Sequence, residues 1–242
     1  MSLVDFRSGA YAAFMVAVTL VMAIIFLPTL VLPRRYAEGA SKVWARTMLW
    51  GLKTFCGLRH EVVGAENRPT GGAIVAAKHQ SAWETIALIA DLPRPVAILK
   101  KELLAIPIYG WWARKCGHIA VDRAAGAKAL RQMTADAQAA IADGRQIIIF
   151  PEGTRVPPGE TRPLQPGVAG VYQRTGATVI PAAHDSGAYW RHPGLRRAPG
   201  VIRLSYLSPI AEGLERKTFL STLKRSIDEE SARLLSSGEN KS

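Results

Sequence analysis

The chain has few cysteines, few acidic residues and few aromatic residues. Its 242 residues include two cysteines, Cys56 and Cys116, too few for the disulfide framework that stabilises small secreted domains. Neither has the spacing of a metal-ligating pair, so both are interpreted as small core residues in a reducing compartment. Acidic residues number 19 against 31 lysines and arginines, a net charge of +12. This surplus attracts phosphate on a nucleic acid, an anionic membrane or a small substrate.

Charged residues are also absent from Ala10 to Leu32. At about 1.5 Å of rise per residue, a helix over this run is long enough to cross a hydrocarbon core of roughly 30 Å. The run is long for the apolar region of a signal peptide, and no clear small-residue cleavage site follows it. Basic residues follow the run, so the positive-inside rule predicts a cytoplasmic location for the long C-terminal part.

A second helical pattern covers Glu38 to Leu58, where aromatic and apolar residues alternate with basic ones. Such a helix can lie in the membrane interface. Residues 1–58 are therefore predicted to form a membrane-embedded or interfacial segment. It is either one span plus an interfacial helix, or two helices embedded in one leaflet. The alternative is that Glu38 to Leu58 packs on the globular domain, because core-facing helices have the same periodicity.

From residue 59 onward, short strand-like runs alternate with helical runs. Strands are expected at 59–63, 73–77, 95–99, 118–121, 146–150, 178–183 and 201–207, and helices at 81–92, 109–115, 125–142, 168–174 and 214–235. This alternation predicts that residues 59–242 form an α/β domain with a mostly parallel sheet flanked by helices.

Reactive side chains follow several of these expected strands. They are His79, Lys101, Arg123, Glu152 and Arg155. Ligands of open α/β sheets bind beyond the carboxyl ends of the strands, so we expect these side chains along one rim. A histidine there suits proton abstraction, and the cations suit a phosphate group.

The segment His79-Gln-Ser-Ala-Trp-Glu84 permits two interpretations of its carboxylate. If Ser81 caps a helix, the entering loop can bend so that one ring nitrogen of His79 meets Glu84 while the other faces a substrate. This arrangement serves a general base. Ser81 and Glu84 also form the pattern of a capping box, in which Glu84 bonds only the N-cap backbone. Two further alternatives are a histidine without a catalytic role and Ser81 as a nucleophile.

The segment Phe150-Pro-Glu-Gly-Thr-Arg155 places a carboxylate, a glycine and an arginine directly after a buried strand. Gly153 allows a ligand to approach the backbone closely. Arg155 has the fork geometry to hold phosphate oxygens bidentately, and Glu152 can accept from a hydroxyl. The alternative is an ordinary turn with an internal Glu–Arg pair.

Four segments together resemble the sequence blocks of the glycerolipid acyltransferase superfamily, specifically the bacterial 1-acyl-glycerol-3-phosphate acyltransferases. They are Lys78 to Glu84, Lys101 to Arg123, Phe150 to Arg155 and Val179 to Pro181, in the family's order and spacing. Two positions depart from the family's pattern. Glu84 stands where aspartate is usual, and Val156 stands where a serine usually follows the arginine.

The resemblance implies transfer of a fatty acyl chain to the free sn-2 hydroxyl of 1-acyl-glycerol-3-phosphate, giving phosphatidic acid for phospholipid synthesis. It implies His79 as general base and Glu84 as its partner. The implied substrate-binding residues are Lys101, Arg123, Glu152, Gly153, Thr154 and Arg155. The expected acyl donor is acyl-CoA or acyl-carrier protein, with no metal and no other cofactor.

The expected location is the inner (cytoplasmic) membrane, with the catalytic domain on the cytoplasmic side and the lipid bilayer as a partner. Two other functions stay open. One is acylation of another lysolipid, such as a lyso-aminolipid, and the other is a non-catalytic basic membrane-binding protein. Nucleic acid is not expected as a partner, because the basic residues are not arranged with aromatic stacking platforms or the fold signatures of nucleic-acid readers.

Overall fold

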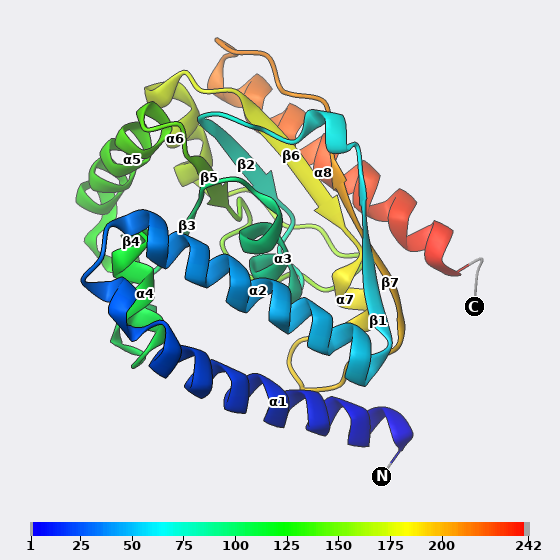
Figure 1. Ribbon diagram of the computed structural model, residues 1–242. Coiled ribbons are helices and arrows are strands. Elements are labelled where there is room, and N and C mark those ends of the chain that lie inside the picture. Colours follow the sequence, from blue (N-terminus) through cyan, green and yellow to red (C-terminus); the bar gives the residue numbers. More distant parts are fainter. Residues whose placement is uncertain (1, 240–242) are drawn as a thin grey trace.

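A seven-stranded sheet in the order β1-β7-β6-β2-β5-β3-β4 lies at the centre of the fold. The computed structural model describes residues 2–239 (Figure 1). The strands are β1 Leu58–Val63, β2 Ala73–Ala77, β3 Pro95–Lys100, β4 Ile119–Val121, β5 Gln146–Ile149, β6 Val179–His184 and β7 Gly200–Tyr206. Neighbours are parallel except β6 and β7, which are antiparallel. The expected α/β class with a mostly parallel sheet is confirmed.

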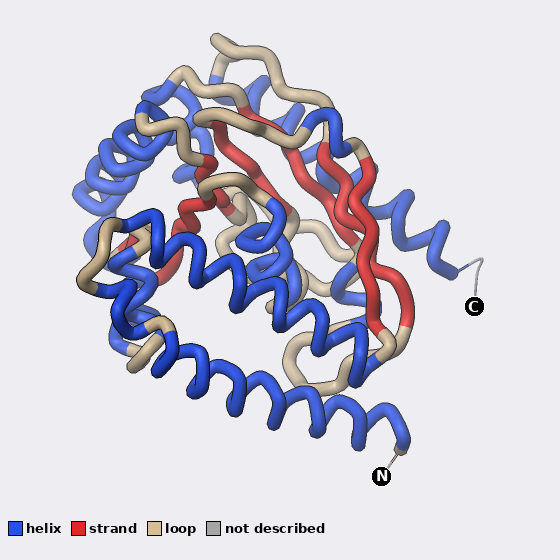
Figure 2. The backbone as a smooth tube through the Cα atoms, viewed as in Figure 1, coloured by secondary structure: helices blue, strands red, loops and turns tan. Residues whose placement is uncertain are grey.

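Helices cover both faces of the sheet (Figures 1 and 2). They are α1 Leu3–Ile25, α2 Arg34–Cys56, α3 Trp83–Asp91, α4 Tyr109–Lys115, α5 Gly126–Ala142, α6 Pro166–Thr175, α7 Ser186–Tyr189 and α8 Arg216–Glu239. One apolar cluster joins α2 and α3 to one face, and a second joins α5, α6 and α8 to the other. Strand β2 contributes Val75 to the first cluster and Ile74 to the second, which is why the strand is apolar throughout.

The two N-terminal helices lie against each other, and α2 also lies over α3 (Figure 1). Helix α2 buries Ala45, Met48, Leu52 and Cys56 in the first core cluster. One face of this helix therefore packs on the globular domain, as the alternative interpretation of Glu38 to Leu58 expected. The division of the chain into a membrane segment, 1–58, and an acyltransferase domain, 59–242, stays a prediction.

Helix α1 is long and apolar enough, by length and composition, to cross a membrane. Its packing is one-sided, with Tyr11 fully buried beside α2 and large apolar side chains such as Phe6, Leu20 and Ile24 exposed. It ends at Ile25, and a short 3-10 turn at Leu27–Leu30 precedes α2. The uncharged run thus covers α1 from Ala10 onward and the turn after it, which contains Pro28, and Pro33 directly precedes α2.

Candidate active site

The central strands β5, β2 and β6 lie side by side and run in the same direction, so they end at one edge of the sheet. Strand β2 leads into Lys78 and His79. Strand β5 leads into the turn from Phe150 to Arg155, and β6 ends at His184. The segments that follow these three strands form the candidate active site.

His79 and Glu84 form a hydrogen-bonded pair at this edge. The distance from His79 Nδ1 to Glu84 Oε1 is 2.7 Å. The Glu84 side chain is fully buried, whereas 17% of the His79 side chain is exposed. Within residues 2–239, no side chain or backbone group bonds His79 Nε2. The ring is thus held at one nitrogen and open to a ligand at the other.

Glu84 also holds the turn that carries His79. Its Oε1 atom accepts from the backbone N–H groups of Gln80 and Ser81, both at 2.9 Å. Its Oε2 atom accepts from the hydroxyls of Ser81 at 2.8 Å and Ser186 at 3.0 Å. The same carboxylate therefore holds both the backbone of this turn and His79, which the sequence presented as alternatives. The predicted capping box with Ser81 as N-cap is not formed, because the N-cap of α3 is Ala82 and no side chain within residues 2–239 caps it.

The helix itself begins two residues later than expected. Its first residue is Trp83, whose backbone N–H donates to the Ser81 hydroxyl at 3.0 Å. The Ser81 side chain is fully buried and bonded to Glu84 and Ser186 rather than to His79. A hydroxyl in this position lacks the exposure and the base contact that an activated nucleophile needs.

The electrostatic environment keeps Glu84 ionised. Burial raises the pKa of the Glu84 carboxyl, but nearby His184, the hydrogen bond from His79 and the backbone N–H groups together lower this pKa to about 2. A carboxylate at this position stabilises the positive charge that develops when His79 takes up a proton. The pair therefore has the geometry and the charge of a general base with its orienting group.

The sequence did not single out His184 and Ser186 as site residues. His184 donates through Nε2 to the Lys78 carbonyl oxygen at 2.8 Å, and its Nδ1 accepts from the Ser186 backbone N–H at 3.3 Å. Both residues are fully buried. They follow the same strand-end rule as His79, but only the strand order shows that β6 is adjacent to β2.

A further contact on the His79 ring comes from Phe150. The two rings stack with their centroids 4.2 Å apart and their planes 20° from parallel. The His79 carbonyl oxygen also accepts from the Val156 backbone N–H at 2.7 Å. The segment after β5 thus fixes both the ring and the backbone of His79.

Glu152 is part of this support. It is buried, and its Oε2 atom accepts from the His79 backbone N–H at 3.1 Å. Its Oε1 atom accepts from the buried Lys78 ammonium at 2.6 Å, and Lys78 also donates to Asp228 of α8 at 3.1 Å. These contacts connect the loop of His79 to the C-terminal helix.

The rest of the predicted turn lies at the same edge. Gly153 has a φ of 70°, a left-handed conformation that glycine adopts without strain, and Thr154 is exposed. Arg155 is partly buried, and its guanidinium donates to a ring nitrogen of His192 at 2.9 Å. His192 is exposed, and the loss of some of its hydration together with the neighbouring Arg155 and His79 lowers its pKa.

Lys101 and Arg123 do not follow the central strands. Lys101 follows β3, the second strand from β2, and its ammonium donates to Asp122 at 3.2 Å. At about 4.8 Å between strands, the end of β3 lies roughly 10 Å from the end of β2. The structure therefore pairs Lys101 with Asp122 rather than with His79. The Arg123 side chain lies outside the described residues.

Metal-binding side chains are not grouped in the part of the chain that the structure describes. No three His, Cys, Asp or Glu residues there are arranged to hold a metal ion. His184 and Asp185 bond neighbouring protein groups instead. His184 donates to the Lys78 carbonyl oxygen, and Asp185 Oδ1 accepts from the Arg203 backbone N–H at 2.9 Å.

Comparison with known proteins relates the whole site to one family. The family model described as acyltransferase matches residues 59–185, more than half of the chain. The chain is 35% identical over 161 residues to 1-acyl-sn-glycerol-3-phosphate acyltransferase of Pseudomonas aeruginosa, covering 66% of this chain and 63% of that protein. It is 29% identical over 211 residues to the protein of the same name from Cocos nucifera, covering 84% of this chain and 66% of the relative. The chain thus matches somewhat less than two thirds of the length of both relatives.

The fold is also that of a solved structure. The crystal structure of the 1-acyl-sn-glycerophosphate acyltransferase of Thermotoga maritima superposes with a TM-score of 0.79, over 96% of this chain and 97% of that chain, at 20% identity. The N-terminal helices are included in this match. The chain belongs to the acyltransferase family, as its four sequence blocks predicted.

Proposed function

We propose that this acyltransferase-family protein transfers a fatty acyl chain from an acyl thioester to the free sn-2 hydroxyl of 1-acyl-glycerol-3-phosphate. The observation that carries the proposal is the His79–Glu84 pair, with Nδ1 bonded at 2.7 Å and Nε2 open. The names of the relatives from Pseudomonas aeruginosa and Cocos nucifera support the choice of lysophosphatidic acid as acceptor.

In the first step, His79 Nε2 accepts the proton of the acceptor hydroxyl as its oxygen attacks the thioester carbonyl carbon. Glu84 keeps the other proton on Nδ1 and stabilises the imidazolium that forms. The buried, ionised state of Glu84 supports this role, because its charge lies next to the ring and away from water.

In the second step, the tetrahedral intermediate collapses. The carbon–sulfur bond breaks, the new ester bond remains, and the His79 imidazolium returns its proton to the departing thiolate. The products are phosphatidic acid and the free thiol of CoA or of the carrier protein. No covalent acyl-enzyme is needed, which agrees with the buried and fully bonded hydroxyl of Ser81.

Arg155 is the proposed phosphate ligand. Its guanidinium lies in the turn after β5 and contacts His192, with no carboxylate bonded to it among residues 2–239. The Gly153 and Thr154 backbone lies beside it for the glycerol unit. Glu152 is proposed to act through His79, because its two oxygens already hold Lys78 and the His79 backbone. Lys101 is exposed and long, so it is the proposed outer cation of the site.

We also propose that the protein works at a membrane. The apolar helix α1 with its exposed side chains fits this association, and the lipid acceptor requires it. The proposed location is the inner (cytoplasmic) membrane with the catalytic domain on the cytoplasmic side, and the basic residues after the uncharged run support this orientation.

The test is an assay of the purified protein with lysophosphatidic acid and, in separate reactions, acyl-CoA and acyl-carrier protein. His79→Ala is expected to abolish transfer while binding to lipid vesicles is unchanged. Ser81→Ala is the matched control, and it should retain transfer if no acyl-enzyme forms. Transfer by His79→Ala at the rate of the unmodified protein would refute the proposal. Equal or faster acylation of a zwitterionic or amino lysolipid would refute the choice of acceptor.

A further inference from the structure

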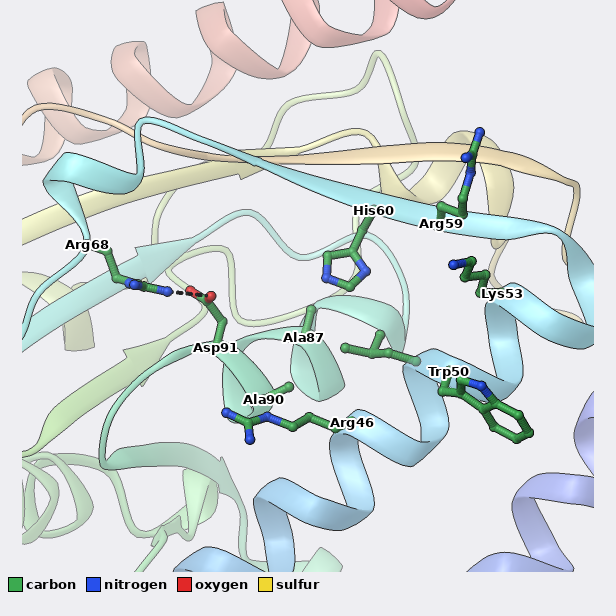
Figure 3. A pocket seen from close by; sticks show the side chains of 10 residues that line it. Arg46, Trp50, Lys53, Arg59, His60, Arg68, Ala87, Ala90 and Asp91 are labelled. Carbon is green, nitrogen blue, oxygen red and sulfur yellow. Dashed lines mark hydrogen bonds and ion pairs between the residues drawn. The ribbon is translucent and has the colours of Figure 1, made fainter.

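A basic concavity lies between α2, β1 and α3, on the face of the sheet that the N-terminal helices cover. It measures about 480 Å³. Its lining includes Arg46 and Lys53 of α2, Arg59 of β1 and Arg68. Figure 3 shows Arg46 extending from α2 toward Ala90 of α3, and His60 pointing from β1 toward the space above Ala87. None of these residues belongs to the candidate active site.

The positive charge of this concavity is not compensated. Asp91 is the one acidic residue among the described residues that line it, and both of its oxygens are occupied. Oδ1 accepts from Arg68 at 2.8 Å, and Oδ2 accepts from the Tyr206 hydroxyl at 2.7 Å. Arg46, Lys53 and Arg59 form no ion pair within residues 2–239. Three cations that line one concavity without a counter-charge give it a positive potential that attracts an anion.

An apolar surface adjoins these cations. Trp50 lines the same concavity and is 58% exposed. Its ring centroid lies 6.0 Å from that of Phe14 in α1, the helix whose large apolar side chains are exposed. An indole between cations and an apolar helix is placed as in the interfacial belt of membrane proteins. The concavity therefore fits a ligand with an anionic end and an apolar end.

We propose that this concavity binds the phosphate head group of an anionic phospholipid in the bilayer, at a place separate from the acceptor site at His79. The Arg46 and Lys53 side chains supply positive charge at the two ends of the concavity, Arg59 adds charge at the rim, and Trp50 lies against the upper acyl chains. The proposal does not rest on acyl transfer, because it concerns lipid binding and its test needs no turnover.

A head group matches the concavity better than a protein partner does. A stable protein interface buries about 800 Å² on each side, more than a hollow of this volume offers by itself. An acidic protein would also leave the exposed Trp50 and the apolar side chains of α1 without an apolar partner. A free phosphate ion would leave the same surface uncovered, so it serves as a competitor in the test.

The test compares two double variants on one helix, each of which removes two exposed positive charges from α2. The concavity variant is Arg46→Gln with Lys53→Gln, and the matched control is Arg34→Gln with Arg35→Gln. Binding of the full chain is measured by co-sedimentation with phosphatidylcholine vesicles, with and without phosphatidylglycerol. Thermal melts verify that both variants are folded.

The unmodified protein is expected to prefer vesicles that contain phosphatidylglycerol. A cation near an anionic surface contributes about fivefold to binding, so the concavity variant should lose roughly 25-fold in affinity for these vesicles. The control should lose less than about fivefold, and neither variant should bind differently to pure phosphatidylcholine. Phosphate or glycerol 3-phosphate should not displace the protein at equal ionic strength.

Three results would overturn the proposal. The first is equal binding of the unmodified protein to both kinds of vesicle. The second is an equal loss for the two double variants, which would mean that only diffuse charge acts. The third is full displacement by inorganic phosphate, which would mean that the ligand is a soluble anion. Loss of vesicle binding with unchanged acyl transfer to a short-chain acceptor would separate this site from the active site.

Discussion

Replacement of Glu84 by glutamine removes one charge and almost no volume. The amide oxygen can still accept from His79 Nδ1 and from the backbone N–H groups of Gln80 and Ser81 at the Oε1 position. The amide nitrogen then takes the Oε2 position, where the Ser81 and Ser186 hydroxyls can rotate to accept from it. The turn and the helix start should therefore persist.

Glu84→Gln is expected to lower the rate of acyl transfer more than the stability of the fold. A neutral amide no longer stabilises the His79 imidazolium, and the equivalent change in hydrolase triads lowers kcat by roughly 10⁴-fold. We expect Glu84→Gln to lower kcat by about 10³- to 10⁴-fold, which is roughly 4 to 5.5 kcal/mol in the transition state. KM for the acceptor should change less than threefold, because Glu84 does not reach the substrate.

Glu84→Asp is a useful second comparison, because it keeps the negative charge and introduces the residue that is usual in the family. The side chain is shorter by about 1.5 Å, and a misplacement of this size costs on the order of 100-fold. The aspartate variant should therefore be slower than the unmodified protein and faster than the glutamine variant. The assay is initial-rate acyl transfer over a range of acceptor concentrations, with circular dichroism to verify folding. A folded Glu84→Gln protein with the unmodified kcat would refute the role of Glu84 as the partner of His79.

Three further predictions concern the surroundings of this pair. Phe150→Leu removes the ring that stacks on His79 at 4.2 Å, so kcat should fall roughly threefold to tenfold with KM unchanged, in the same initial-rate assay. Lys78→Met leaves the buried Glu152 carboxylate without its cation and should lower the free energy of unfolding by about 3 to 5 kcal/mol, measured by urea titration; a loss below 1 kcal/mol would contradict the buried pair. The pKa of Glu84 is about 2 in the folded protein against an ordinary 4.5. Ionised Glu84 therefore adds roughly 3 kcal/mol to the free energy of unfolding above pH 4.5, and this contribution is lost as the pH falls toward 2. Thermal melts between these pH values should show that Glu84→Gln lacks this part of the acid dependence.

Much of the fold follows from local patterns. The run from Ala73 to Ala77 is apolar at every position because both faces of β2 are covered, and its bounds agree with those expected. The helix at Tyr109–Lys115 also agrees, and the other elements expected between residues 59 and 207 differ by at most two residues at each end. The C-terminal helix starts two residues later than expected and ends four residues later, and α2 starts four residues earlier. The difference at the α3 start has a local cause, since the Ser81 hydroxyl accepts from Trp83 and leaves two residues in the turn.

The strand order could not be obtained in this way, and the site depends on it. Lys101 and Arg155 both follow strands, but β5 is the neighbour of β2 and β3 is not. The contact between Lys78 and Asp228 joins residues 150 positions apart, and no short pattern encodes it. His184 carries no such signal in the sequence, because its approach to Glu84 arises only when β6 pairs with β2.

Glu84 combines parts of the two interpretations of its carboxylate, although Ala82 and not Ser81 is the N-cap of α3. A carboxylate has two oxygens and about four acceptor positions, so a cap contact does not exhaust it. In this chain the Oε1 atom serves the turn and His79 together, and the Oε2 atom serves the two serine hydroxyls. The contacts with the turn fix the carboxylate, and the fixed carboxylate orients the histidine. A variant that loses the turn contacts must therefore also lose the alignment of His79, which is why a charge-only change such as Glu84→Gln separates the two contributions better than any change in side-chain length.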